Sequence, residues 1–194
     1  MAWQISEQIR EKEKKVGIVG ARALPPEYKE KVSSVAKYLL GKGYQLHLGG
    51  AYGADQYALE AIISAGAISK GVLFSAWSSV AGFPREVQKY VDYFVSHQGK
   101  VLWGLVPPHS SRSVAIAGLL SRNQRLVNAS SGLVAFIYGE STGTKNTIRK
   151  AIERGLKVVA FPCGENAALP EVSSGRWVEL RCVEPWKGAY LFKR

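Results

Sequence analysis

Short apolar runs that alternate with helical patterns constrain the fold of this 194-residue chain more than any other feature. Apolar segments occupy 15–22, 44–50 and 70–77, and amphipathic patterns at 25–43 and 54–66 lie between them. Alternation of strands and helices in this order is typical of a parallel sheet with helices on both faces. The sequence therefore predicts an α/β fold with three layers, α/β/α, and a mainly parallel sheet.

The second half of the chain continues the alternation with less regular spacing. The predicted elements are helices at 83–99, 111–130 and 143–155, strands at 132–138 and 156–162, a short strand or extended connector at 100–108, and one or two edge strands or a hairpin at 176–194. The apolar face of the helix at 111–130 is predicted to comprise Val114, Ile116, Ala117, Leu120 and Leu126. Because crossovers between parallel strands are right-handed, the arrangement is expected to be Rossmann-like.

The length of the chain suits one domain with small additions. We expect a charged amino-terminal arm at 1–14, a Rossmann-like domain at 15–164, and carboxyl-terminal edge strands of the same domain at 165–194. No apolar run approaches the roughly 20 residues of a membrane helix, and the amino-terminal residues lack the apolar core of a secretory signal. We therefore expect a cytoplasmic protein with no membrane partner, and with Cys163 and Cys182 as reduced thiols.

The charge balance indicates an anionic partner. The chain has 26 Lys and Arg residues against 15 Asp and Glu residues, a net charge of +11. A field of this sign attracts nucleic acid or a phosphate-bearing ligand. The histidines and cysteines show no metal-ligand spacing, so neither a metal nor another cofactor is expected. The chain also lacks G-x-G-x-x-G and G-K-[ST], which disfavours a dinucleotide oxidoreductase and an NTPase.

Three glycine-bearing loops follow predicted strands and precede predicted helices. They are Gly20-Ala21-Arg22, the loop from Gly49 to Asp55 that includes Gly50 and Gly53, and the loop from Gly139 to Thr147. The carboxyl ends of parallel strands share one edge of the sheet, where ligands of such folds bind, so the loops are expected to converge. Glycine lets a phosphate approach the free backbone N–H groups of a helix N-terminus. The loops therefore predict an anion site.

Polar side chains beside these loops strengthen that prediction. Arg22 offers a planar, permanently charged fork that suits phosphate oxygens. Thr144 and Thr147 add hydroxyl donors near the start of their helix. Arg122 and Asn123 come from the helix that precedes a buried strand, which places them at the rim of the predicted pocket.

Taken in order, these segments resemble the DprA/Smf family of DNA-processing proteins within the SLOG superfamily. Gly20-Ala21-Arg22 resembles the family's Gly-Ser-Arg, with alanine in place of serine, and "GGAYGAD" at 49–55 resembles its Ser-Gly-x-Ala-x-Gly-Ile-Asp loop. Residues 121–138 look like Arg-Asn-Arg-x-Ile-x-x-x-Ser-x-x-x-x-Val. Residues 143–164 resemble the family's Gly-[Ser/Thr]-x-x-Thr helix and the strand that ends in Pro-Gly. The resemblance covers about residues 15–164.

The resemblance implies an extended Rossmann fold, binding of single-stranded DNA in a basic pocket at these loops, and a homodimer. Carried onto this sequence, the pocket residues are Arg22, which would hold a phosphate, Gly50, Gly53, Gly143 and Thr144 as lining, Asp55 as a brace for its loop, and Arg122 and Asn123 as the rim. The family's helical and winged-helix domains have no counterpart in the sequence, so we expect a nearly bare Rossmann module.

Three other classes of function stay open at this point. SLOG proteins that sense a nucleotide share the fold, as do LOG-type nucleoside-monophosphate phosphoribohydrolases, which carry Pro-Gly-Gly-x-Gly-Thr-x-x-Glu. Aligning Gly143-Thr144 with that motif places Thr147 at the glutamate, while Glu140 lies out of register. Carboxylates carry out glycosidic cleavage, and Thr147 stands where the motif has its glutamate. A binding protein without catalytic residues is therefore preferred over a hydrolase. The third class is a dimerisation scaffold that binds neither ligand.

Overall fold

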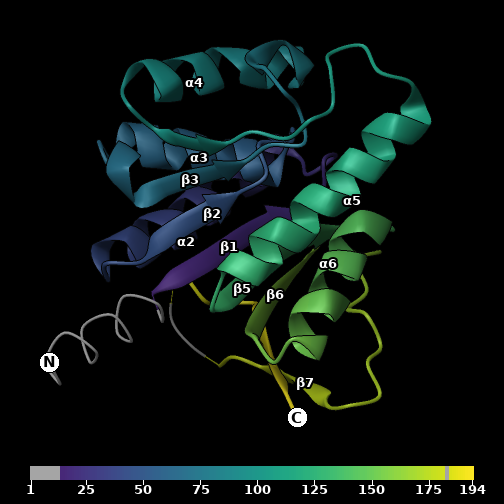
Figure 1. Cartoon of the computed structure of the whole chain (residues 1–194). Helices are drawn as coiled ribbons and strands as arrows, with labels where there is room; N and C mark the ends of the chain where they lie inside the picture. Colours follow the sequence, from purple (N-terminus) through teal and green to yellow (C-terminus); the bar gives the residue numbers. More distant parts are fainter. Residues whose placement is uncertain (1–13, 182–183) are drawn as a thin grey trace, which may run out of the picture.

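A computed structural model describes residues 14–181 and 184–194 (Figure 1). The predicted arm at 1–14, apart from Lys14, lies outside the described residues, as does Cys182. Within the described ranges the strands form one eight-stranded sheet in the order β4-β3-β2-β1-β5-β6-β8-β7. The strands are β1 (Lys15–Gly20), β2 (Gln45–Leu48), β3 (Gly71–Phe74), β4 (Lys100–Leu102), β5 (Gly132–Tyr138), β6 (Lys157–Cys163), β7 (Arg176–Glu179) and β8 (Tyr190–Lys193).

The helices form a layer on each face of this sheet. They are α2 (Lys29–Gly41), α3 (Ala54–Ser64), α4 (Arg85–Ser96), α5 (Arg112–Ala129) and α6 (Thr142–Glu153), with short 3-10 turns η1 (Pro26–Tyr28), η2 (Ile68–Lys70) and η3 (Val80–Gly82). α2, α3 and α4 cover one face, and α5 and α6 cover the other (Figure 1). Two apolar cores result, one on each side of the sheet.

β1 lies in the interior of the sheet and contributes to both cores. It pairs in parallel with β2 and with β5. Successive side chains of a strand point to opposite faces, and accordingly Ile18 belongs to the core under α2 and α3 while Val19 belongs to the core under α5 and α6. Both side chains are buried. The predicted α/β fold, with a mostly parallel sheet between two helical layers, is confirmed.

The carboxyl ends of β1 and β5 form the topological switch point of the sheet. The chain leaves β1 toward α2 on one face and leaves β5 toward α6 on the opposite face. The two connections therefore diverge, and a crevice opens between the ends of two adjacent strands.

The predicted burial of the helix at 111–130 is wrong for its first half. Only Leu126 of the predicted apolar face is buried, whereas Val114, Ile116, Ala117 and Leu120 are exposed. The reason is length, because 18 residues of helix span about 27 Å, while the six residues of β1 span about 20 Å. The amino-terminal half of α5 extends past the sheet (Figure 1).

The carboxyl-terminal segment adds two strands to the edge of the sheet. β8 pairs antiparallel with β6, and β7 pairs antiparallel with β8. The Trp177 indole N–H donates to the Pro170 carbonyl at 2.9 Å, which fixes the loop before β7. No helix within the described ranges is long and apolar enough to cross a membrane.

Candidate functional site

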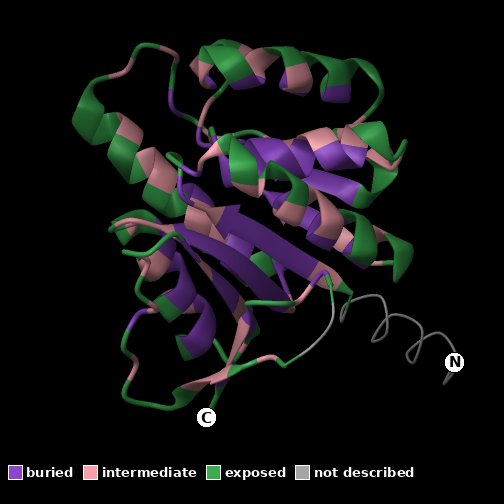
Figure 2. Cartoon of the chain, turned by 180° about the vertical axis from the view of Figure 1, so that it is seen from behind, coloured by how far each residue is buried: buried purple, intermediate pink, exposed green. Residues whose placement is uncertain are grey.

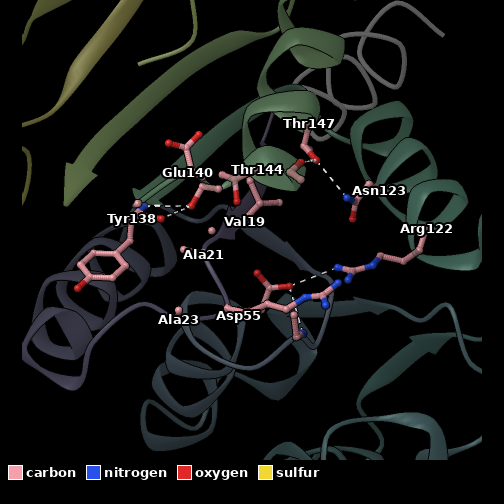
Figure 3. A pocket seen from close by; sticks show the side chains of 16 residues that line it. Val19, Ala21, Ala23, Asp55, Arg122, Asn123, Tyr138, Glu140, Thr144 and Thr147 are labelled. Atoms are coloured by element: carbon pink, nitrogen blue, oxygen red, sulfur yellow. Dashed lines mark hydrogen bonds and ion pairs between the residues drawn. The ribbon is translucent and has the colours of Figure 1, made fainter. Parts of the chain in front are cut away.

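A cavity of about 580 Å³ opens at the carboxyl ends of β1 and β5 (Figure 3). We call it the β1–β5 cavity. Its lining residues are Val19, Gly20, Ala21, Arg22, Ala23, Ala51, Asp55, Arg122, Asn123, Tyr138, Gly139, Glu140, Ser141, Gly143, Thr144 and Thr147. Nine of the twelve predicted site residues are among them, and Gly49, Gly50 and Gly53 are not. Three segments that are far apart in the sequence therefore meet here with the middle of α5.

The N-terminus of α6 forms one wall of the cavity. Ser141 precedes the helix in a left-handed conformation, with φ of 40°. Its hydroxyl accepts from the Tyr138 N–H at 3.1 Å and donates to the Tyr138 carbonyl at 2.6 Å, and no side chain caps the first turn of α6. The first-turn N–H groups therefore keep their capacity to bind an oxyanion. A Cβ at Gly143 would meet nothing within 4 Å, so the space beside this backbone is open.

A buried ion pair lies on the opposite side of the cavity. Arg122 Nη1 and Asp55 Oδ2 are 3.3 Å apart, and their side chains are 6% and 3% exposed. The same carboxylate oxygen accepts the N–H groups of Gly49 at 3.1 Å and Ala51 at 3.3 Å. Burial raises the pKa of the Asp55 carboxyl, although Arg122 and the two amides favour its charged form. Asp55 thus holds the loop after β2 to α5.

Arg122 has donor capacity that the protein itself does not use. Its Nε is buried and has no hydrogen-bond partner among the described residues. Burial is the main effect that lowers the pKa of Arg122, and the charge of Arg22 acts in the same direction, while Asp55 opposes both. Leaving a buried donor of a charged group unpaired is costly. The Arg122 side chain is also part of the cavity lining (Figure 3), which places its positive charge beside the cavity.

Asn123 and Thr147 connect α5 to α6. Asn123 Nδ2 donates to Thr147 Oγ1 at 3.1 Å, and Thr147 Oγ1 donates to the Gly143 carbonyl at 2.9 Å (Figure 3). Thr147 is 2% exposed. Its hydroxyl proton is therefore engaged within the protein, and the residue positions the first turn of α6 instead of presenting the predicted free donor.

The glycines of the loop after β2 lie outside the lining of the cavity. A Cβ at Gly49 would lie 1.1 Å from Arg122 Nη1, so this glycine makes room for the buried guanidinium. Gly50 and Gly53 adopt positive φ angles of 69° and 81° and pack against the Phe83 ring and the Ala21 carbonyl, respectively. The three glycines allow close packing beside the cavity.

The loop after β1 matches the prediction more closely. A Cβ at Gly20 would lie 2.5 Å from Ala54 Cβ, so α3 packs directly on the end of β1. The Ala21 N–H donates to the Phe136 carbonyl at 2.9 Å and continues the pairing of β1 with β5. Arg22 is exposed and lines the cavity, so its guanidinium is available to an incoming anion.

Tyr138 and Glu140 line the cavity although the sequence analysis assigns neither to the site. Tyr138 ends β5, and its place at the carboxyl end of a predicted central strand is the signal that could have identified it. Glu140 is an exposed carboxylate in the loop between β5 and α6. The lining therefore combines two guanidinium groups, an aromatic ring, the buried carboxylate of Asp55 and the exposed carboxylate of Glu140.

Comparison with known proteins identifies the family of this chain. A family model described as DNA recombination-mediator protein A matches residues 6–173. The DNA processing protein DprA of Bacillus subtilis (strain 168) is 28% identical over 151 residues, which are 78% of this chain and 49% of that protein. The chain therefore spans about half the length of this curated relative.

Two solved structures share the fold. DNA processing protein A from Helicobacter pylori, described with a single-stranded DNA binding mode, has a TM-score of 0.63 at 20% identity, covering 80% of this chain and 68% of that one. DprA from Streptococcus pneumoniae has a TM-score of 0.61 at 21% identity, covering 79% and 52%. At this level of identity, the two likenesses establish the fold alone.

Proposed function

Because this chain belongs to the DNA recombination-mediator protein A family, we propose that it binds single-stranded DNA through the β1–β5 cavity. The observation that carries the proposal is the buried Arg122, whose Nε lacks a partner among the described residues and which lines a cavity beside an uncapped helix N-terminus. The single-stranded DNA binding described for the Helicobacter pylori relative supports the same ligand. The net charge of +11 favours a polyanion.

We propose that one phosphate of the strand sits between Arg22 and the first turn of α6. The open space beside Gly143 allows the phosphate to approach the N–H groups. Arg22 supplies an exposed positive charge, and the buried Arg122 supplies a second positive charge from the cavity lining. Tyr138 offers a ring on which a base can stack, an interaction that every base can make. Asp55 holds Arg122 in place and does not touch the ligand.

A free nucleotide is the second candidate ligand, because Glu140 lies in the same lining. The cavity volume falls within the range of small-molecule sites, which is about 300–1,000 Å³. A carboxylate near a bound nucleotide is the group that LOG-type hydrolases use for glycosidic cleavage. Release of free base from a nucleoside monophosphate, abolished by Glu140→Gln, would favour this candidate over DNA binding.

Fluorescence anisotropy with a labelled oligonucleotide tests the proposed function. We expect binding that weakens steeply as salt increases, because phosphate contacts release counterions. Arg22→Ala should weaken binding about tenfold for every sequence, since a phosphate contact carries no base information. Lys37→Ala on α2 removes an exposed positive charge elsewhere and is the matched control. Equal affinities of the Arg22 and Lys37 variants would refute the assignment of Arg22.

The proposal also covers assembly, location and domain limits. We propose a cytoplasmic homodimer, as the family resemblance implies, and sedimentation velocity at several concentrations tests the dimer. We also propose that residues 165–194 complete the same domain as 15–164, because β8 pairs with β6 and the Phe192 side chain joins the core under α6.

A further inference from the structure

An exposed apolar ridge lies beside the β1–β5 cavity. It comprises residues 103–121, which are the loop after β4 and the first half of α5. Leu105 is 94% exposed, and Val114, Ile116 and Leu120 are each more than 40% exposed. Figure 2 shows the first turns of α5 mostly exposed, where they project beyond the sheet. Exposed apolar side chains on the loop after β4 and on more than one side of α5 indicate a contact site for a partner.

The ridge carries positive charge without negative charge. No Asp or Glu occurs between Asp92 and Glu140, a stretch that includes the whole ridge. Arg112 lies at the start of α5 and is exposed. A surface that combines basic and aromatic side chains and lacks carboxylates complements a polyanion with exposed bases. Two copies of the same ridge would instead bring like charges together, which disfavours a second copy as the partner.

The ridge is linked to the loop that lines the cavity through the buried Phe83 ring. Trp103 directly follows β4, and the Phe83 ring lies against it with centroids 6.2 Å apart. Phe83 packs on Gly50, the residue next to Ala51 in the cavity lining. Trp103 follows β4, and Arg22 follows β1. These strands are three positions apart in the sheet, so their carboxyl ends are separated laterally by about 14 Å.

Arg125 fixes the base of the ridge. Its Nη1 donates to the Trp103 carbonyl at 3.4 Å, and its Nη2 donates to the Ser75 carbonyl. A Cβ at Gly118 would lie 2.3 Å from Val106 Cγ2, so the loop packs directly on α5. The exposed side chains are thus presented from a firmly packed backbone.

From these observations we infer that the ridge carries the single strand onward from the cavity. Bases rest on the Trp103 ring and on exposed aliphatic side chains such as Leu105, while Arg112 faces the phosphates. This inference rests on the proposed function, because it extends the same bound strand from one phosphate site to several nucleotides. The proposed function alone predicts contacts at the cavity only.

Anisotropy with oligonucleotides of about four and about twelve nucleotides tests the inference. Leu105→Asp places a negative charge on the ridge at a side chain that is 94% exposed, and Val95→Asp does the same at an exposed site on α4. We expect Leu105→Asp to weaken binding of the longer strand at least about fivefold and of the shorter strand little. Val95→Asp should alter neither, and both variants should keep the wild-type melting temperature.

Tryptophan fluorescence gives a second readout. The longer strand should quench emission in the wild type, and Trp103→Phe should remove that part of the quenching. Equal effects of Leu105→Asp and Val95→Asp on the longer strand would overturn the inference and leave the cavity site intact. A dimer that Leu105→Asp dissociates, with DNA binding unchanged, would assign the ridge to a second copy and also overturn it. Absence of binding at both lengths in the wild type would instead refute the proposed function.

Discussion

His47 gives the stability of this protein a pH dependence that follows from its surroundings. The ring is 2% exposed in the middle of β2, with Nδ1 2.9 Å from Ser130 Oγ and Nε2 3.1 Å from Gln45 Oε1. Burial lowers its pKa to about 4 from the ordinary 6.5, and the positive charges of Lys15 and Lys100 act in the same direction. Folding therefore favours the neutral imidazole.

The sign of the effect follows from the protons bound in each state. Above pH 6.5 the imidazole is neutral in both states, and His47 contributes no pH dependence. Between pH 6.5 and about 4 the unfolded chain binds a proton that the native protein does not, so the free energy of unfolding decreases as the pH falls. The full loss is about 3 kcal/mol, and about 2 kcal/mol of it occurs between pH 7.5 and pH 5.

Urea unfolding of the wild type and of His47→Gln from pH 7.5 to pH 5 measures this contribution. Glutamine does not titrate, so the difference in unfolding free energy between the two proteins should change by about 2 kcal/mol in favour of the variant as the pH falls. A wild-type–His47→Gln difference that stays constant across this range would refute the reasoning.

Three further predictions concern packing around the site. Gly49→Ala should lower the free energy of unfolding, measured in urea, by about 3 kcal/mol or more, because the new Cβ would displace Arg122 from Asp55. A decrease of less than about 1 kcal/mol would contradict this. Asp55→Asn should lower the free energy of unfolding by about 3–5 kcal/mol, because it leaves Arg122 buried without a carboxylate. Adding Arg122→Met to this variant should restore part of that free energy. Cys163 is buried and its pKa is raised to about 12, so in a Cys182→Ser variant a thiol reagent at pH 8 should react only after denaturation.

The order of strands and helices could be predicted from the sequence because periodicity reports which residues face a core. β1 and β5 are short apolar runs that are each followed by a predicted helix, and their carboxyl ends had to share one edge of a parallel sheet. Arg22 and Gly143 were accessible to the same reasoning, since each directly follows such a strand or begins the next helix. Predicting that their loops converge required no knowledge of side-chain contacts.

The parts that sequence reasoning missed depend on segments that are distant along the chain. The space beside Gly49 is filled by Arg122, which is 73 positions later, and no local pattern reveals that contact. The exposed face of α5 depends on the length of the helix relative to its neighbouring strands, whereas periodicity reports only that one face is apolar. Thr147 was predicted as a hydroxyl donor, but its proton goes to the Gly143 carbonyl one turn earlier in α6, and the distant contact at this hydroxyl is the amide of Asn123 on α5, which donates to it.

The pairing of β1 with β5 has a consequence for how the protein is made. Val16 pairs with Gly132, 116 positions later, and a ribosome that adds 5–20 residues per second needs about 6 to 23 s to synthesise the intervening chain. During that interval one edge of β1 has no neighbour, and the nascent polypeptide lacks α6 entirely. The β1–β5 cavity thus cannot form before α6 is synthesised, and a cell that halts translation before α6 obtains a fragment without this cavity.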